Sequence, residues 1–188
     1  MGGFLWIESK NMKRKIQIGV MGSCADLQYD NKTQAAAEKI GEEIAKRGGV
    51  LFFGAEKDLD SLSSAACRGA KKNNGLTIGV TYGKDKKVIE KNADIIIPSG
   101  LEKGGGRELV LVLSCDVIIA ISGGSGTLTE MAIAYQANIP IIALKGYGGW
   151  TDKMADKYFD KRNRRKIIGA NSPREAVEFA FKEVNNFI

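Results

Sequence analysis

The feature that most constrains the fold is a short, almost unbroken apolar run, Asp116 to Ile121 (DVIIAI), with helical patterns before and after it. A strand that is apolar on both faces belongs inside a sheet that is covered on both faces. Further strand-like runs occur at Lys15 to Val20, Val50 to Phe53, Leu76 to Val80, Ile95 to Ile97, Ile141 to Leu144 and Ile167 to Gly169. The run from Asp116 to Ile121 therefore predicts a central strand, and the other runs predict further strands of the same sheet.

Helical patterns separate most of these strands. Helices are expected at about Thr33 to Lys46, Leu59 to Lys72, Arg107 to Ser114 and Thr127 to Gln136, and after Ser172, where Pro173 and Glu175 complete a capping box. Parallel strands need crossover connections, which cover both faces of a sheet. The sequence therefore predicts a Rossmann-like α/β fold with a doubly wound, mostly parallel sheet. We expect one domain, residues 15–188, after an N-terminal extension, residues 1–14.

The residue counts exclude several kinds of chemistry. The chain has no histidine, which Ser-His-Asp and Cys-His catalysis, His-ligated zinc and proximal-His haem all need. Cys24, Cys67 and Cys115 form no CxxC pair, so they predict small buried residues of a reducing cytoplasm and no metal site. The longest apolar stretch, Leu109 to Ile121, is too short to span a bilayer, which takes about 20 residues. We expect a soluble, cytoplasmic protein.

The charge balance favours anionic partners, since 28 Lys and Arg against 22 Asp and Glu give a net charge of +6. The densest basic block is Lys157 to Lys166 (KYFDKRNRRK), which fits either a nucleic-acid patch or a solvated surface. No recognition motif accompanies the block, and we therefore favour the surface and do not expect nucleic acid as a partner.

The strongest functional signal is Ser122 to Glu130 (SGGSGTLTE), between a predicted strand and a predicted helix. Glycines let the backbone approach a ligand closely, and the free N–H groups of a helix N-terminus attract an anion. The loop Gly123, Gly124, Ser125, Gly126, Thr127 therefore predicts a phosphate site, with a tight turn as the alternative. Ligands of such sheets bind outside the carboxyl ends of the strands, so Gly22 and Ser23 after the first strand face the same edge.

Two charged residues near this loop each have two interpretations. Glu130 stands three residues after Thr127, which is also the spacing of a capping box without any function. Arg107 fits an exposed arginine in the first turn of a helix, although a cation is unfavourable there. Asp116 fits a residue that orients the start of its strand through backbone hydrogen bonds.

The stretch from Arg107 through SGGSGTLTE to Ile139-Pro-Ile-Ile142 resembles the Lonely Guy family of nucleotide-binding proteins, often labelled lysine decarboxylase-like. Within that family it most resembles the branch of the molybdenum cofactor carrier proteins, which share a tail like Lys145-Gly-Tyr-Gly-Gly149. The resemblance covers Lys15 to Trp150. It implies a homodimeric phosphoribohydrolase that cleaves the base from a nucleoside 5′-monophosphate, or alternatively a carrier that binds a phosphorylated pterin cofactor without turnover.

Site residues follow from the same resemblance. Glu130 matches the catalytic glutamate, which as an anion would stabilise a ribosyl cation or activate water. Arg107 matches the catalytic arginine, which would hold the phosphate or the departing base. The matches to the phosphate loop and to the turn after the first strand are Gly123, Gly124, Gly126, Thr127, Gly22 and Ser23. The resemblance implies no required cofactor: the ligand is a nucleoside monophosphate or a molybdopterin-type molecule. No lysine is placed to anchor pyridoxal phosphate, so we do not expect a lysine decarboxylase.

Two departures from the family pattern stand out. The hydrolases have a GGGxxGxM segment after the second strand, whereas Gly54 to Ser61 reads GAEKDLDS, with one glycine and three acids. Ser122 also replaces the proline that opens the family's PGGxGT motif.

Overall fold

A computed structural model of the chain describes residues 14–186. The strands in this part of the chain are β1 (Gln17–Gly22), β2 (Val50–Gly54), β3 (Leu76–Thr81), β4 (Ile95–Pro98), β5 (Val117–Ile121), β6 (Ile141–Leu144) and β7 (Ile168–Ala170). The helices are the short 3-10 helix η1 (Ala25–Leu27), α1 (Asn31–Lys46), α2 (Leu62–Lys71), α3 (Arg107–Leu113), α4 (Ser125–Gln136), α5 (Gly149–Met154) and α6 (Pro173–Asn185). Of the predicted extension, only Arg14 lies within the described residues.

All strands join one parallel sheet in the order β4-β3-β2-β1-β5-β6-β7. From β1 the chain winds outward to β4, then returns to place β5 beside β1 and winds the other way. The switch point of this doubly wound sheet therefore lies between β1 and β5, where Gly22 pairs with Ile121. The fold class predicted from the sequence is confirmed.

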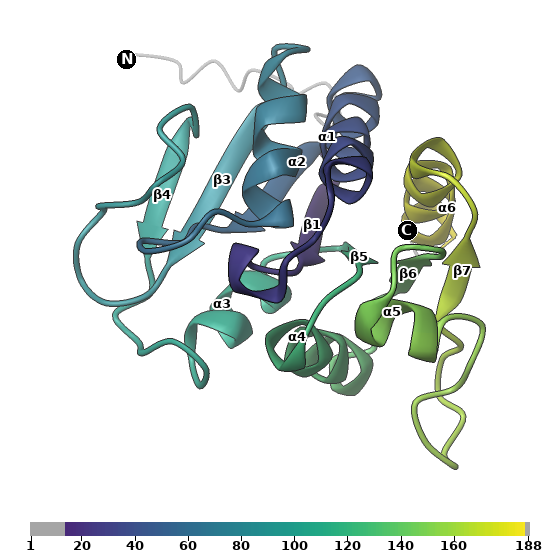
Figure 1. The fold of residues 1–188 in the computed structure, drawn as a ribbon. Helices are drawn as coiled ribbons and strands as arrows, with labels where there is room; N and C mark the ends of the chain where they lie inside the picture. The colour runs from purple at the N-terminus through teal and green to yellow at the C-terminus, as the bar shows by residue number, and fades with distance from the viewer. Residues whose placement is uncertain (1–13, 187–188) are drawn as a thin grey trace, which may run out of the picture.

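Helices cover both faces of the sheet (Figure 1). One core lies under α1, α2 and α6, and the other under α3 and α4. The central strand β5 serves both, since Val117, Ile119 and Ile121 pack into the first core and Ile118 and Ala120 into the second. A strand that fills two cores needs apolar residues at every position, which confirms the prediction for this run.

One connection has no helix, as the sequence indicated, and another has a helix that the sequence did not predict. No helix lies between β3 and β4, so residues 82–94 cross as a loop. The unpredicted α5 follows β6 in a glycine-rich stretch. Elsewhere the predictions hold with shifted ends: α2 begins at Leu62 after the N-cap Ser61, and Ser172 caps α6 by accepting a hydrogen bond from the Glu175 N–H.

Three smaller features also relate to the sequence analysis. Asp116 accepts a hydrogen bond from the Gln17 N–H at 2.9 Å and pairs with Arg14, and it thus ties the start of β5 to β1. The basic block forms a largely exposed loop between α5 and β7 (Figure 1), which fits both of its interpretations. Within residues 14–186, no helix is long and apolar enough to cross a membrane.

Candidate functional site

The glycine-rich loop follows β5 directly and leads into α4. Ser122 and Gly123 have positive φ angles of 56° and 92°, so the chain turns sharply at two successive residues. A Cβ on Gly123 would lie 2.5 Å from the side chain of Thr127, and only glycine fits there. Gly124 is the N-cap of α4, and no side chain caps this helix. The first N–H groups of α4 therefore resemble those of anion-binding helix N-termini.

Ser23 joins the loop after β1 to the loop after β5. Its buried hydroxyl accepts a hydrogen bond from the Gly123 N–H at 2.8 Å and lies 3.1 Å from the Ser122 hydroxyl. Ser122 stands where the family pattern has proline, whose ring fixes φ near about −65°. The turn found here, with its φ of 56°, needs a residue other than proline at this position.

A cleft of about 270 Å³ opens beside these loops. Its walls are Ser23, Leu27, Ser122, Gly123, Gly124, Gly149, Trp150 and Lys153. Of the predicted phosphate residues, Ser125 and Gly126 lie exposed in the first turn of α4, while Thr127 is buried beneath Gly123. The structure thus brings the loops after β1 and β5 together around one hollow.

The wall formed by α5 is the part of the cleft that the sequence did not predict. The N–H groups of Trp150 and Thr151 donate to the carbonyls of Gly123 and Ser122 at 2.9 and 3.0 Å. Gly149 lies so close to the loop that a Cβ would come within 2.4 Å of the Ser122 carbonyl carbon. The signal was present in the glycines of Lys145-Gly-Tyr-Gly-Gly149, which we matched to the family without assigning a helix. Lys153, whose Nζ lies 4.5 Å from the Trp150 ring centroid, adds a positive charge to the cleft.

Arg107 begins α3 and is only 5 % exposed, so the interpretation as an exposed first-turn arginine is wrong. Its Nη2 lies 3.1 Å from an oxygen of Glu56 and 3.1 Å from an oxygen of Glu108. Burial alone would lower its pKa, but Glu56, Glu130 and Glu108 raise the pKa above its ordinary value. Buried carboxylates therefore hold this guanidinium charged and in place.

Glu130 lies in the second turn of α4 and is buried. The capping-box interpretation is wrong, because the helix begins after Gly124 and Thr127 is already inside it. Burial raises the pKa of Glu130 to about 8; Arg107 opposes this shift, and Glu108 and Glu56 reinforce it. The direction of this shift favours the protonated carboxyl group in the free protein, whereas the sequence led us to expect an ionised Glu130.

Sequence reasoning missed three members of this charged cluster, namely Glu108, Glu56 and Lys103. Glu56, two residues after the end of β2, is buried and contacts both Arg107 and Lys103. The Nζ of Lys103 lies 3.1 Å from the second Glu56 oxygen. Lys103 comes from the loop before α3. The signal was the acid-rich GAEKDLDS segment, which we noted only as a departure from the family pattern.

Cys24 lies between the cleft and the charged cluster. It follows Ser23, and the charges of Glu56, Lys103 and Arg107 all act on its thiol. Burial, with a contribution from Glu56, raises its pKa to about 11, so the thiol stays protonated. Cys67 and Cys115 are buried as expected, whereas Cys24 is only partly buried. Within residues 14–186, no group of His, Cys, Asp and Glu side chains could hold a metal ion.

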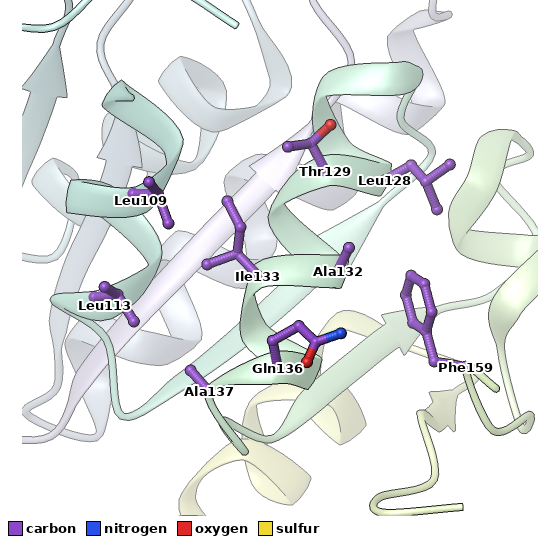
Figure 2. A pocket seen from close by; sticks show the side chains of 9 residues that line it. All are labelled: Leu109, Leu113, Leu128, Thr129, Ala132, Ile133, Gln136, Ala137 and Phe159. Atoms are coloured by element: carbon purple, nitrogen blue, oxygen red, sulfur yellow. The ribbon is translucent and has the colours of Figure 1, made fainter. Parts of the chain in front are cut away.

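A separate apolar groove of about 740 Å³ lies between α3 and α4. Figure 2 shows Leu109 and Leu113 on α3 and Ile133 on α4 along this groove, with Phe159 at its far side. Leu109 and Leu113 are 43 % and 59 % exposed. Such a continuous apolar surface is typical of an interaction site.

The fold and the site define the class: a doubly wound α/β protein with a glycine-rich loop at the switch point of its sheet. The chain belongs to the SLOG cluster4 family, which it matches over residues 15–177. This membership confirms the resemblance to the Lonely Guy family.

Known proteins extend the comparison. The chain is 35 % identical over 130 residues to an uncharacterised protein of Archaeoglobus fulgidus, covering 69 % of this chain and 80 % of that protein. The molybdenum cofactor binding protein of Rippkaea orientalis has 32 % identity and a TM-score of 0.77, over 91 % of this chain and 98 % of that one. The molybdenum cofactor carrier protein of Chlamydomonas reinhardtii has 29 % identity and a TM-score of 0.75, over 92 % and 99 %. Family and relatives together support a nucleotide-related binding role.

Proposed function

We propose that this protein binds a nucleoside 5′-monophosphate at the carboxyl edge of its sheet and hydrolyses the N-glycosidic bond. The observation that carries the proposal is the buried pair of Arg107 and Glu130 on the same edge as the glycine-rich loop. A phosphate at one end and a proton donor at the other are what such a reaction needs.

The phosphate end is formed by Gly123 to Thr127, with Gly22 and Ser23 beneath it. The uncapped start of α4 offers N–H donors and the positive end of a helix dipole. Lys153 supplies a positive charge at the cleft wall. A phosphate held here would lie among donors and away from the carboxylates around Arg107.

Glu130 would act first as an acid and then as a base. As the N-glycosidic bond breaks, its electron pair goes to the base nitrogen, which takes the proton of Glu130. The carboxylate formed in this step stabilises the ribosyl cation beside it, and water then adds to C1′ and returns a proton to Glu130. A carboxyl group whose pKa is raised to about 8 is suited to this role near neutral pH. Arg107 would orient the departing base and stabilise the transient charges.

The test compares Glu130→Gln with the wild type by measuring free base released from nucleoside monophosphates. Glutamine keeps the shape of the protonated acid but cannot give up a proton, so we expect unchanged binding and a rate lower by about 10²-fold or more. Glu102→Gln, an exposed acid before α3, is the matched control and should retain full activity. Full activity in Glu130→Gln would exclude Glu130 as the acid.

The likeness to two molybdenum cofactor proteins favours a second candidate function, a carrier that binds a phosphorylated pterin without turnover. A carrier needs the phosphate loop but not the proton transfer. If the wild type binds nucleotides or a pterin phosphate yet releases no base from any nucleoside monophosphate, the carrier function replaces the hydrolase.

We further propose that the groove between α3 and α4 is the interface of a homodimer. A second copy of the chain would cover the exposed side chains of Leu109 and Leu113. The two helices that form the groove, α3 and α4, also carry Arg107 and Glu130. Dimer formation would thereby fix the helices that carry the charged cluster.

A further inference from the structure

We infer that Glu56 determines which ligands the Arg107 end of the site accepts, and that it selects an uncharged base with N–H donors against an anionic one. The inference rests on the proposed function, which places the phosphate at Gly123 to Thr127 and the base toward Arg107 and Glu130. Glu56 belongs to neither the phosphate loop nor the proton-donating pair.

The ion pairs around Glu56 leave no cation unmatched in this cluster. One Glu56 oxygen lies 3.1 Å from Nη2 of Arg107, and the other lies 3.1 Å from Nζ of Lys103. Arg107 is shared with Glu108, whose oxygen also lies 3.1 Å from Nη2. The positive charges of Arg107 and Lys103 are therefore balanced by the carboxylates of Glu56 and Glu108, even without Glu130. An additional anion would find no unpaired positive charge in this cluster.

Unpaired buried atoms point to what this end of the site lacks. Among the described residues, the second oxygen of Glu108 accepts no hydrogen bond and Nη1 of Arg107 donates none, although both atoms are buried. In the same part of the chain, the second oxygen of Glu56 contacts only the Nζ of Lys103. Buried polar atoms in folded proteins normally have a partner, which a ligand can supply. A buried carboxylate oxygen of Glu108 without a partner, beside a Glu56 oxygen held only by the half-exposed Lys103, fits a ligand edge that carries N–H groups.

Glu56 is held firmly enough to act as a fixed group. The Ala55 N–H donates to the Val80 carbonyl at 2.9 Å, and the Glu56 carbonyl accepts from the Ile89 N–H at 2.9 Å. The residue is 4 % exposed. A ligand anion that sought Arg107 would have to displace a buried, backbone-anchored carboxylate, which is unfavourable.

Guanosine and xanthosine 5′-monophosphates form a matched pair of probes. They differ at one position of the purine, where guanine has an amino group that donates N–H bonds and xanthine has an oxygen. The xanthine base is an anion at mildly alkaline pH, whereas guanine is uncharged. Both nucleotides carry the same ribose and phosphate, so the ratio of their dissociation constants isolates the contacts of the base.

We would measure both dissociation constants by titration calorimetry at mildly alkaline pH, in the Glu130→Gln background, in which turnover is slow. We expect this background protein to bind the guanosine nucleotide at least about tenfold more tightly. Adding Glu56→Gln should bring the ratio close to one, whereas Glu56→Asp should largely keep it. Lys103→Met removes a half-exposed cation that faces Glu56, and it should increase the ratio, which provides a second test with little effect on folding.

Asp58→Asn is the control for charge alone, because Asp58 is an exposed acid two residues from Glu56 and should leave the ratio unchanged. Equal affinities before Glu56 is changed, or a ratio that neither Glu56→Gln nor Lys103→Met alters, would overturn the inference and leave the proposed function standing. If no variant binds either nucleotide, the proposed function fails and this inference fails with it.

Discussion

A Cβ on Gly54 would lie 2.5 Å from Nη1 of Arg107. No side chain fits at this last residue of β2, because the Arg107 guanidinium at the start of α3 occupies the space. Glycine in a strand interior usually weakens the strand, and a close approach is one of the reasons to keep it. The position of Arg107 is thus set by a residue remote in sequence.

Replacing Gly54 by alanine should push Arg107 away from Glu56 and Glu108. We expect a loss of about 1–3 kcal/mol in the free energy of unfolding, typical of overpacking, together with a lower rate of base release. Urea unfolding and a base-release assay would measure both. Gly105→Ala is the control, since nothing lies within 4 Å of a Cβ at that position. Wild-type stability and rate in Gly54→Ala would contradict the prediction.

Removing the Ser23 hydroxyl should loosen the contact between the loops after β1 and β5. Ser23→Ala leaves the Gly123 N–H without its partner at 2.8 Å, and an unpaired buried N–H typically costs about 1–3 kcal/mol. We expect lower stability and weaker binding of adenosine monophosphate, measured by thermal unfolding and calorimetry. Ser122→Ala, which removes only the bond between the two hydroxyls, should have a smaller effect. Equal effects of the two substitutions would argue against Ser23 as the connecting residue.

The raised pKa of Glu130 makes a prediction about stability and pH. Its pKa is about 8 in the folded protein against an ordinary value of 4.5, so between these pH values the folded state holds a proton that the unfolded state has lost. Stability from this group therefore falls as pH rises from about 4.5 to about 8 and changes little outside that window.

Glu130→Gln removes this titration while keeping the shape of the side chain. The variant and the wild type should be similarly stable below the lower end of the window, and the variant should become the more stable of the two as pH rises toward its upper end. Urea unfolding of both proteins across this pH range measures the difference between their free energies of unfolding. The other carboxylates contribute alike in both proteins, so their contributions largely cancel in this difference. A difference independent of pH would show that the Glu130 pKa is not raised.

A negative charge in the apolar groove should separate the proposed dimer. Leu113 is 59 % exposed in the single chain, so Leu113→Glu should fold normally but place a carboxylate within the proposed interface. Light scattering should give a dimer mass for the wild type and a monomer mass for the variant. Leu59→Glu changes an exposed leucine outside the groove and should remain dimeric. A wild-type monomer at micromolar concentration would exclude the dimer itself.

The sequence predicted the sheet well because its signals are local. The apolar run of β5, the glycines after it and the Ser172 cap each depend on neighbouring residues, and each is found in the structure. The same local rules failed at Glu130, because the spacing from Thr127 matches a capping box while the helix begins at Ser125. The left-handed turn at Ser122 and Gly123 moves the helix start, and spacing alone does not show this.

Other parts of the site depend on contacts between distant segments. The α5 helix is short and begins among glycines, and its first N–H groups bond to Ser122 and Gly123 rather than to its own sequence neighbours. The pairing of Glu56 with Arg107 arises from the sheet order, which brings the end of β2 near the start of α3. No periodicity within either segment carries that information.

The bonds from α5 also fix the directions of two peptide planes in the glycine-rich loop. With the carbonyls of Ser122 and Gly123 both held by α5, the N–H groups on the opposite side of these trans peptides point away from that helix. Neither plane can flip without breaking a hydrogen bond, so the loop has little conformational entropy left to lose when a ligand arrives. A loop ordered in advance spends less of its binding free energy on its own immobilisation, and a glycine-rich segment can then bind tightly despite its intrinsic flexibility.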